Sequence, residues 1–282
     1  MKIAITGGSG LIGTALTKRL QERGDEVISI TRQMLSLSPQ ELSSQLDGIQ
    51  ILINLAGAPI LSRWTSARKK EIYDSRIVTT RKLVDAIVLM QEPPELLISG
   101  SAIGIYSSQG EHTEESVQFS DDFLGNVCRD WEAAAMKSPV RTVILRTGIV
   151  LSTEGGALKK MLLPFRLGLG GRIASGRQVL SWMHMEDYIE AILFIIDTAA
   201  PPDVVNMASP HPLDNTSFVR ILGEALKRPV IFQVPGFVLK LIFGEGAVTL
   251  TKGHSVIPKR LTEAGFRYRY PDLKSALSNL LS

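Results

Sequence analysis

The first residues able to do chemistry are closely spaced glycines near the amino terminus. The segment TGGSGLIG contains the pattern G-x-G-x-x-G, and it lies between an apolar run and a helical pattern. Glycine permits a tight turn and lets a diphosphate approach the backbone, while the helix that follows directs free amides at the phosphates. A glycine turn without a ligand is the alternative. We predict a dinucleotide-binding turn formed by Gly7, Gly8, Ser9, Gly10, Leu11, Ile12 and Gly13.

The end of the second apolar run distinguishes between the two nicotinamide dinucleotides. An acidic residue there would bind both ribose hydroxyls and repel a 2′-phosphate. This chain has Thr31 and Arg32 instead. A guanidinium forms charge-assisted hydrogen bonds with phosphate, and a threonine hydroxyl can add another. The sequence therefore predicts NADP(H) rather than NAD(H), unless Arg32 is only a solvated surface charge.

A parallel sheet is needed to position these groups, and the hydrophobic pattern predicts one. Short apolar runs alternate with helical patterns, which is typical of βαβ units and of an α/β doubly wound parallel sheet, the Rossmann fold. The predicted strands are residues 2–6, 26–31, 34–37, 49–55, 95–99 and 141–146. The predicted helices between them begin near residues 11, 39, 66 and 121.

The pattern changes after residue 151. A glycine-rich stretch precedes a predicted strand at residues 179–184 and a predicted helix at 186–198. We place an NAD(P)-binding Rossmann domain at residues 1–155 and a smaller, mostly helical C-terminal lobe at residues 156–282, partly interleaved with the sheet.

Composition restricts the partners of the chain. It has 282 residues, 44% of them hydrophobic, and a net charge of +3 with acidic and basic residues interleaved. We expect no nucleic acid as partner, and no metal site, because the histidines show no ligand spacing. Cys128 is the single cysteine and cannot form a disulfide within the chain. A reducing compartment, the cytoplasm, is therefore expected. No signal peptide and no apolar stretch near the ~20 residues of a membrane span are predicted.

Longer segments carry a family resemblance. They are ITGGSGLIG, NLAGAPI, SGSAIGIYSSQGEHTEE, RTGIVLSTEGG and IPKRLTEAGFRYRYPDL. Together they resemble the extended short-chain dehydrogenase/reductase superfamily, and in particular its atypical epimerase-like subgroup, which has its own C-terminal domain of unknown function. The resemblance implies a dinucleotide in the sheet crevice, with its nicotinamide end facing the C-terminal lobe. It further implies a cofactor lining, largely of backbone, made by Asn54, Leu55, Ala56, Gly57 and Arg146.

The same resemblance implies a catalytic tyrosine, a lysine four residues later that lowers its pKa, and a serine that orients the substrate carbonyl. Alignment on Glu132 places Leu124 at the tyrosine position and Cys128 at the lysine position. Neither residue can perform the usual chemistry, because leucine carries no proton and an ordinary thiol is neutral near pH 7.

The remaining catalytic candidates come from neighbouring motifs. The serine corresponds to Ser101, with Ser99 as a rival, and Arg76 replaces an asparagine that usually supports a proton-relay water. Tyr106 is the nearest phenol, although packing against the sheet edge is the favoured interpretation. Cys128 is either a reactive thiol, if Arg76 or the cofactor stabilises a thiolate, or an inert buried hydrophobe, which is favoured.

These observations predict an NADP(H)-binding oxidoreductase or epimerase-like enzyme that acts on an unknown small carbonyl or hydroxyl substrate. A catalytically inactive NADP(H) sensor or scaffold is the alternative, because the Tyr-x-x-x-Lys pair is missing. A nucleotide-sugar epimerase is a second alternative, from the resemblance alone. The resemblance also implies a homodimer formed through the helices near residues 66–90 and 121–137.

Overall fold

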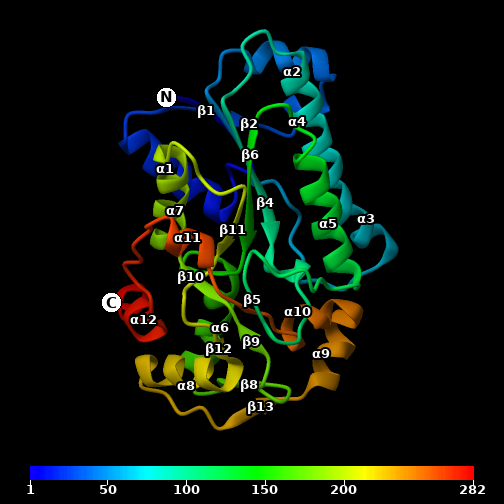
Figure 1. Cartoon of the computed structure of the whole chain (residues 1–282). Helices are drawn as coiled ribbons and strands as arrows, with labels where there is room; N and C mark the ends of the chain where they lie inside the picture. The colour runs from blue at the N-terminus through cyan, green and yellow to red at the C-terminus, as the bar shows by residue number, and fades with distance from the viewer.

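The computed structural model describes residues 1–282, and a six-stranded parallel sheet forms its centre (Figure 1). The strand order is β11-β6-β4-β3-β1-β2. The strands are β1 Lys2–Thr6, β2 Glu26–Ile30, β3 Ile51–Asn54, β4 Leu96–Ala102, β6 Arg141–Thr147 and β11 Val204–Met207. Since β2 and β3 lie on opposite sides of β1, the winding direction reverses between β1 and β3. In doubly wound sheets this reversal opens the ligand crevice at the carboxyl ends of the strands.

Helices cover both faces of the sheet. The helices α1 Leu11–Glu22 and α7 Met185–Asp197 pack together on one face, and the other face carries α2 Pro39–Leu46, α3 Ser66–Asp74, α4 Ile77–Leu89 and α5 Phe123–Ala135 (Figure 1). Side chains alternate between the two cores along a strand. In β1, Ile3 and Ile5 join the core under α1 and α7, whereas Ala4 joins the core under α2 and α4.

The C-terminal lobe has a core of its own. Leu158, Phe218 and Leu277 are buried in it and come from three helices of the lobe. The lobe helices are α6 Gly156–Arg166, α8 Asn215–Leu226, α9 Gly236–Phe243, α10 Val248–Thr251, α11 Lys259–Glu263 and α12 Leu273–Leu281. No helix in the structure combines the length and apolar character required to span a membrane.

Short strands, paired in twos, and 3-10 turns complete the fold. The short strands are β5 Glu111–His112, β7 Ile149–Leu151, β8 Gly171–Ile173, β9 Val179–Leu180, β10 Trp182–His184, β12 Leu213–Asp214, β13 Phe232–Val234 and β14 Ser255–Val256. The 3-10 turns are η1 Met34–Ser36, η2 Ile103–Ile105 and η3 Gly244–Ala247. The pair β14 and β5 fixes the lobe against the loop after β4.

Three predicted elements differ in the structure. Residues 34–37 are not a strand: Thr31 accepts hydrogen bonds from the amides of Met34 and Leu35, which turns the chain into η1 directly after β2. The sixth strand is instead β11, from the part of the chain assigned to the lobe. The strand predicted at residues 179–184 is divided into β9 and β10 at Ser181.

Candidate functional site

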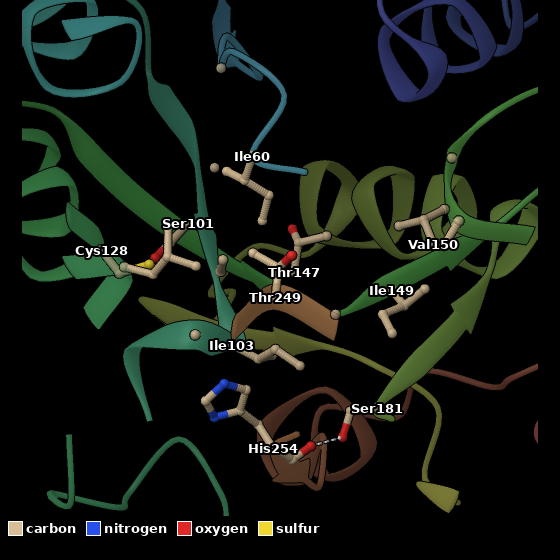
Figure 2. Close-up of a pocket in the computed structure, with 18 of the residues that line it drawn as sticks. Ile60, Ser101, Ile103, Cys128, Thr147, Ile149, Val150, Ser181, Thr249 and His254 are labelled. Atoms are coloured by element: carbon tan, nitrogen blue, oxygen red, sulfur yellow. Dashed lines mark hydrogen bonds between the residues drawn. The ribbon is translucent and has the colours of Figure 1, made fainter. Parts of the chain in front are cut away.

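A cavity of about 580 Å³ lies at the carboxyl ends of the parallel strands, where the sheet meets the lobe. Gly7 and residues 10–13 supply one wall, and the segments after β3, β4 and β6 supply others. Residues 248–254 close it from the lobe. Figure 2 shows Ser101 and Cys128 on one side of this cavity and Val150 on the other, with Thr147 between them.

The glycine turn has the geometry of a phosphate cradle. Gly7 adopts φ +70°, and a Cβ on it would lie 2.7 Å from the Leu55 carbonyl oxygen. A Cβ on Gly13 would lie 2.2 Å from the Gly7 carbonyl oxygen, so only glycine lets α1 pack against the turn. The Gly10 amide donates to Gly7, while the amides of Leu11, Ile12 and Gly13 have no acceptor in the chain. This set of free donors at a helix amino terminus suits a diphosphate.

The other residues expected to bind a dinucleotide differ in whether they are exposed or line the cavity. Thr31 and Arg32 are exposed after β2, beside the turn. Leu55, Ala56 and Gly57 line the cavity. Ser9 and Gly8 belong to the turn, although only its other members contribute to the cavity wall.

Asn54 lies behind the lining rather than in it. Its side chain is buried, accepts a hydrogen bond from Thr6 at 2.7 Å and donates one to Thr80 at 2.8 Å. Trp131 donates to the same Thr80 hydroxyl at 3.0 Å. Asn54 therefore holds β1, β3 and α4 together, and it positions the backbone that follows it.

Arg146 also lies behind the lining, in a buried network. It donates two hydrogen bonds to Glu132, from Nε and Nη2, each at 2.8 Å. Its Nη1 donates at 2.8 Å to the Tyr106 hydroxyl, which in turn donates to Asn206. Although burial opposes the charge, the bonds to Glu132 raise the pKa of Arg146. Ser101 completes the network by donating to Glu132 at 2.7 Å.

Ser101 and Tyr106, two of the catalytic candidates, belong to this network but differ in their access to the cavity. Ser101 lines the cavity, whereas Tyr106 does not line it and is fully buried. Burial raises the pKa of Tyr106, and the charge of Arg146 only partly opposes this effect. Tyr106 therefore packs inside the protein and supports Arg146, in agreement with the packing interpretation.

Cys128 lines the cavity as a protonated thiol. Burial, and then the nearby charge of Glu132, raise the pKa of its thiol to about 12, although Arg76 acts in the opposite direction. The thiol is thus protonated near neutral pH, and a thiol rather than a thiolate is a poor nucleophile. Leu124, one helical turn earlier, also faces the cavity and carries no proton to transfer.

His254 is a site residue that the sequence analysis missed. Its Nδ1 lies 3.2 Å from the Ser107 carbonyl oxygen, which can only accept, so Nδ1 carries the hydrogen and Nε2 keeps its lone pair. Burial lowers the pKa of His254, so the ring is neutral at pH 7. Figure 2 shows the ring projecting into the cavity beneath Ile103, with the His254 carbonyl bonded to Ser181 at 2.7 Å. No motif surrounds His254; it lies in the turn between α10 and β14, and the pairing of β14 with β5 brings it here.

Two further groups missed from the sequence complete the wall. Tyr188, from α7, shares a hydrogen bond of 2.9 Å with Thr147, and burial raises the pKa of its phenol to about 12. Lys252 donates to Asp122 at 2.9 Å and so connects the lobe to the start of α5. Asp122 is also the N-cap of α5, since its side chain accepts from the Gly125 amide.

The fold and this site define a dinucleotide-binding α/β protein of the Rossmann class with an added lobe. Residues 3–208 match the NAD dependent epimerase/dehydratase family, and residues 234–280 match a domain of unknown function, DUF1731. The chain therefore belongs to the NAD dependent epimerase/dehydratase family. This confirms the resemblance to epimerase-like proteins with their own C-terminal domain, and it confirms the fold class.

Several individual proteins are similar over the full length. The mouse epimerase family protein SDR39U1 is 39% identical over 293 residues, which cover 100% of both chains. The crystal structure of human SDR39U1 (isoform 2) with NADPH is 36% identical, covers 99% of each chain and gives a TM-score of 0.92. A nucleoside-diphosphate sugar epimerase from Corynebacterium glutamicum is 29% identical, with a TM-score of 0.80 over 100% of this chain and 58% of that one.

Proposed function

We propose that this protein binds NADP(H) at the glycine turn and is an oxidoreductase or epimerase-like enzyme for a small carbonyl or hydroxyl compound. One observation carries the proposal: the free amides of α1 and the side chains of Ser101 and His254 line the same cavity. The NADPH found with the similar human protein supports the choice of cofactor. Arg32, exposed beside the turn, is the residue we assign to the 2′-phosphate.

Two side chains of the cavity, Ser101 and His254, can act on a hydroxyl or carbonyl substrate. The Ser101 hydroxyl donates a hydrogen bond to Glu132, so the lone pairs of its oxygen can accept a hydrogen bond from a substrate hydroxyl. His254 supplies the proton-transfer group in place of the absent family tyrosine, because its Nε2 is an unprotonated base that faces the cavity. When bound, the nicotinamide would supply or accept a hydride.

A panel experiment tests this function. NADPH binding is titrated by nicotinamide fluorescence, and the loaded protein is then offered aldehydes, ketones, quinones and nucleotide sugars while nicotinamide absorbance is followed. We expect turnover of at least one carbonyl compound, and losses of about 10²-fold or more in Ser101→Ala and in His254→Gln. His211→Gln, a change to an exposed histidine outside the cavity, is the control and should retain activity.

The same experiment distinguishes the alternatives. Tight NADPH binding without turnover of any compound would favour a sensor or scaffold, for which the neutral Cys128 and the aliphatic Leu124 are the supporting observations. Epimerisation of a nucleotide sugar leaves the nicotinamide unchanged overall and begins with its oxidised form, so this alternative is tested separately: an epimeric product detected by chromatography, after a nucleotide sugar is offered to protein loaded with NADP⁺, would favour it. Absence of NADPH binding would contradict all three functions.

A further inference from the structure

The cavity has two parts. The glycine turn and residues 55–57 form the part that we assign to the dinucleotide. Arg76 belongs to this part, because its guanidinium donates to the Ala58 carbonyl at 3.1 Å and a Cβ on Gly57 would lie only 3.0 Å from it. The rest of the wall comes mainly from the end of β4, from α5 and from the lobe. We call it the substrate part, since it is the space left for a second ligand.

The strong side-chain donors of the substrate part are already used within the chain. Lys252 donates to Asp122 at 2.9 Å, so the two charges neutralise each other. Ser181 and Thr249 donate to backbone carbonyls at 2.7 and 2.8 Å. The indole of Trp131 donates to a buried threonine hydroxyl at 3.0 Å. None of these groups has a hydrogen to offer an anion.

The two hydroxyls at the end of β6 are also satisfied by each other and by the backbone. Thr147 donates to the Leu145 carbonyl at 3.3 Å, so the bond of 2.9 Å that it shares with Tyr188 uses the phenolic hydrogen. Burial raises the pKa of Tyr188 to about 12, so this hydrogen is retained at neutral pH. The Cys128 thiol is left, and a thiol is only a weak donor.

Two hydrogen-bond acceptors, in contrast, remain available to a ligand. The Ser101 hydroxyl must donate to Glu132, because that carboxylate is paired with Arg146 and has no hydrogen to give. The lone pairs of the Ser101 oxygen are therefore available. His254 carries its hydrogen on Nδ1, against the Ser107 carbonyl, which leaves a lone pair on Nε2. Ser101 and the neutral His254 can thus accept a hydrogen bond from a ligand but cannot donate one.

Apolar side chains form most of the surface around these acceptors. In Figure 2, Ile103 lies above the His254 ring, and Ile60 projects into the same cavity. Such a wall suits a ligand made mainly of carbon and hydrogen. It disfavours a charged ligand, which would lose its hydration without meeting an unpaired opposite charge. The apolar members of the substrate part are Ile60, Ile103, Leu124, Val127, Leu180 and Val248.

We propose that the substrate part binds an uncharged, mainly apolar alcohol, whose hydroxyl group donates a hydrogen bond to Ser101 or to His254. This inference rests on the proposed function and narrows its substrate to one chemical class. A ketone, an ether or a carboxylate offers only lone pairs and would leave the buried acceptors unpaired. The alcohol is therefore the form that the cavity binds more tightly, and the matching carbonyl compound is the form that it binds more weakly.

Two sets of matched small molecules test this inference. One set is 1-phenylethanol, its methyl ether, acetophenone and 2-phenylpropionate, and the other is cyclohexanol, its methyl ether, cyclohexanone and cyclohexanecarboxylate. Dissociation constants are measured by calorimetry and by ligand-observed NMR. The free protein is titrated with every compound, and the NADPH complex with the alcohols, ethers and carboxylates, which NADPH does not reduce. Each alcohol should bind about fivefold tighter, or more, than its matched compounds, because only the alcohol can donate.

Variants then assign the preference to the two acceptors. The double variant Ser101→Ala, His254→Phe removes both and should bring each alcohol within about twofold of its ether. His254→Gln supplies an amide that can donate as well as accept, so acetophenone should gain affinity relative to 1-phenylethanol. His211→Gln, an exposed residue outside the cavity, is the control and should keep the wild-type order. If the double variant is unfolded, the order of affinities in wild type and in His254→Gln decides the question.

Three outcomes would overturn the inference. They are an ether, ketone or carboxylate that binds wild type as tightly as the matched alcohol, absence of binding by both alcohols, and a preference for alcohols that survives in the folded double variant. Failure of wild type to bind NADPH would refute the proposed function separately, because the alcohols are also titrated against the free protein.

Discussion

Replacing Glu132 by glutamine removes the charge that neutralises Arg146 inside the protein. The side chains of Glu132 and Arg146 are only 12% and 7% exposed. Water therefore cannot solvate the guanidinium once the carboxylate is gone. Arg146 would keep its contact with the Tyr106 hydroxyl. The glutamine oxygen can accept only part of the three hydrogen bonds that Glu132 now receives from Ser101 and Arg146.

The expected effect is large for a substitution that preserves shape. Removing one partner of a buried ion pair lowers the free energy of unfolding by about 3–5 kcal/mol. Because glutamine has the same shape as glutamate and still accepts hydrogen bonds, we expect a loss of about 3 kcal/mol, at the low end of this range. A protein of this size loses about 2–4 °C in melting temperature per kcal/mol. Glu132→Gln should therefore melt roughly 6–12 °C below wild type.

Thermal unfolding followed by circular dichroism measures this difference. The control is Glu224→Gln, which breaks an exposed i,i+4 pair whose partners are 62% and 61% exposed. Such pairs contribute about 0–1 kcal/mol. In the double variant Glu132→Gln, Arg146→Met the unpaired charge is absent, and much of the stability should return. A melting temperature of Glu132→Gln equal to that of the control would refute the reasoning.

Other predictions concern the cofactor and pH. Arg32→Asp should weaken NADPH binding at least tenfold and NADH binding by less than threefold in fluorescence titrations; equal losses would contradict the assignment. Burial lowers the pKa of His254 in the folded protein below its ordinary value of 6.5, so as the pH falls the unfolded chain takes up the proton first. The contribution of His254 to stability is therefore complete above pH ~6.5 and decreases at lower pH. His254→Gln should lose less melting temperature than wild type between pH ~7 and ~5, and parallel curves would exclude this effect. The groups whose charges act on this ring, Asp122, His112 and Lys252, are the same in both proteins.

The sheet and the glycine turn could be predicted because their signals are local. Apolar runs and turn glycines identify strands and a phosphate-binding turn regardless of what lies elsewhere in the chain. The strand β11 was missed for the opposite reason. Val204–Met207 is a run of four residues after two prolines, and it becomes a strand only by pairing with β6, in the register of Val204 opposite Ile144.

The candidate site was harder to predict than the sheet, because it depends on contacts between residues far apart in the sequence. The family resemblance gave Ser101, and alignment on Glu132 gave Cys128, but neither shows that Ser101 donates a hydrogen bond to Glu132 or that burial raises the pKa of the thiol. His254 reaches the cavity through the pairing of β14 with β5, which joins segments more than 140 residues apart. Pairing of this kind is determined by tertiary packing and leaves no local pattern.

The central claim is that the free amides of α1 hold the diphosphate of NADP(H), and Gly10→Ala tests it most directly. Gly10 has φ −78° and ψ 169°, which alanine adopts, and its Cβ would lie 3.2 Å from the Gly7 carbonyl oxygen, where a small adjustment suffices. The methyl group would nevertheless obstruct the approach of the diphosphate. The control is Gly236→Ala, whose Cβ would lie 3.5 Å from that of Ala174, in ordinary contact and outside the cavity. NADPH titrations should show at least a tenfold loss in Gly10→Ala and a change within twofold in Gly236→Ala, with both proteins folded. Wild-type affinity in a folded Gly10→Ala would contradict the account.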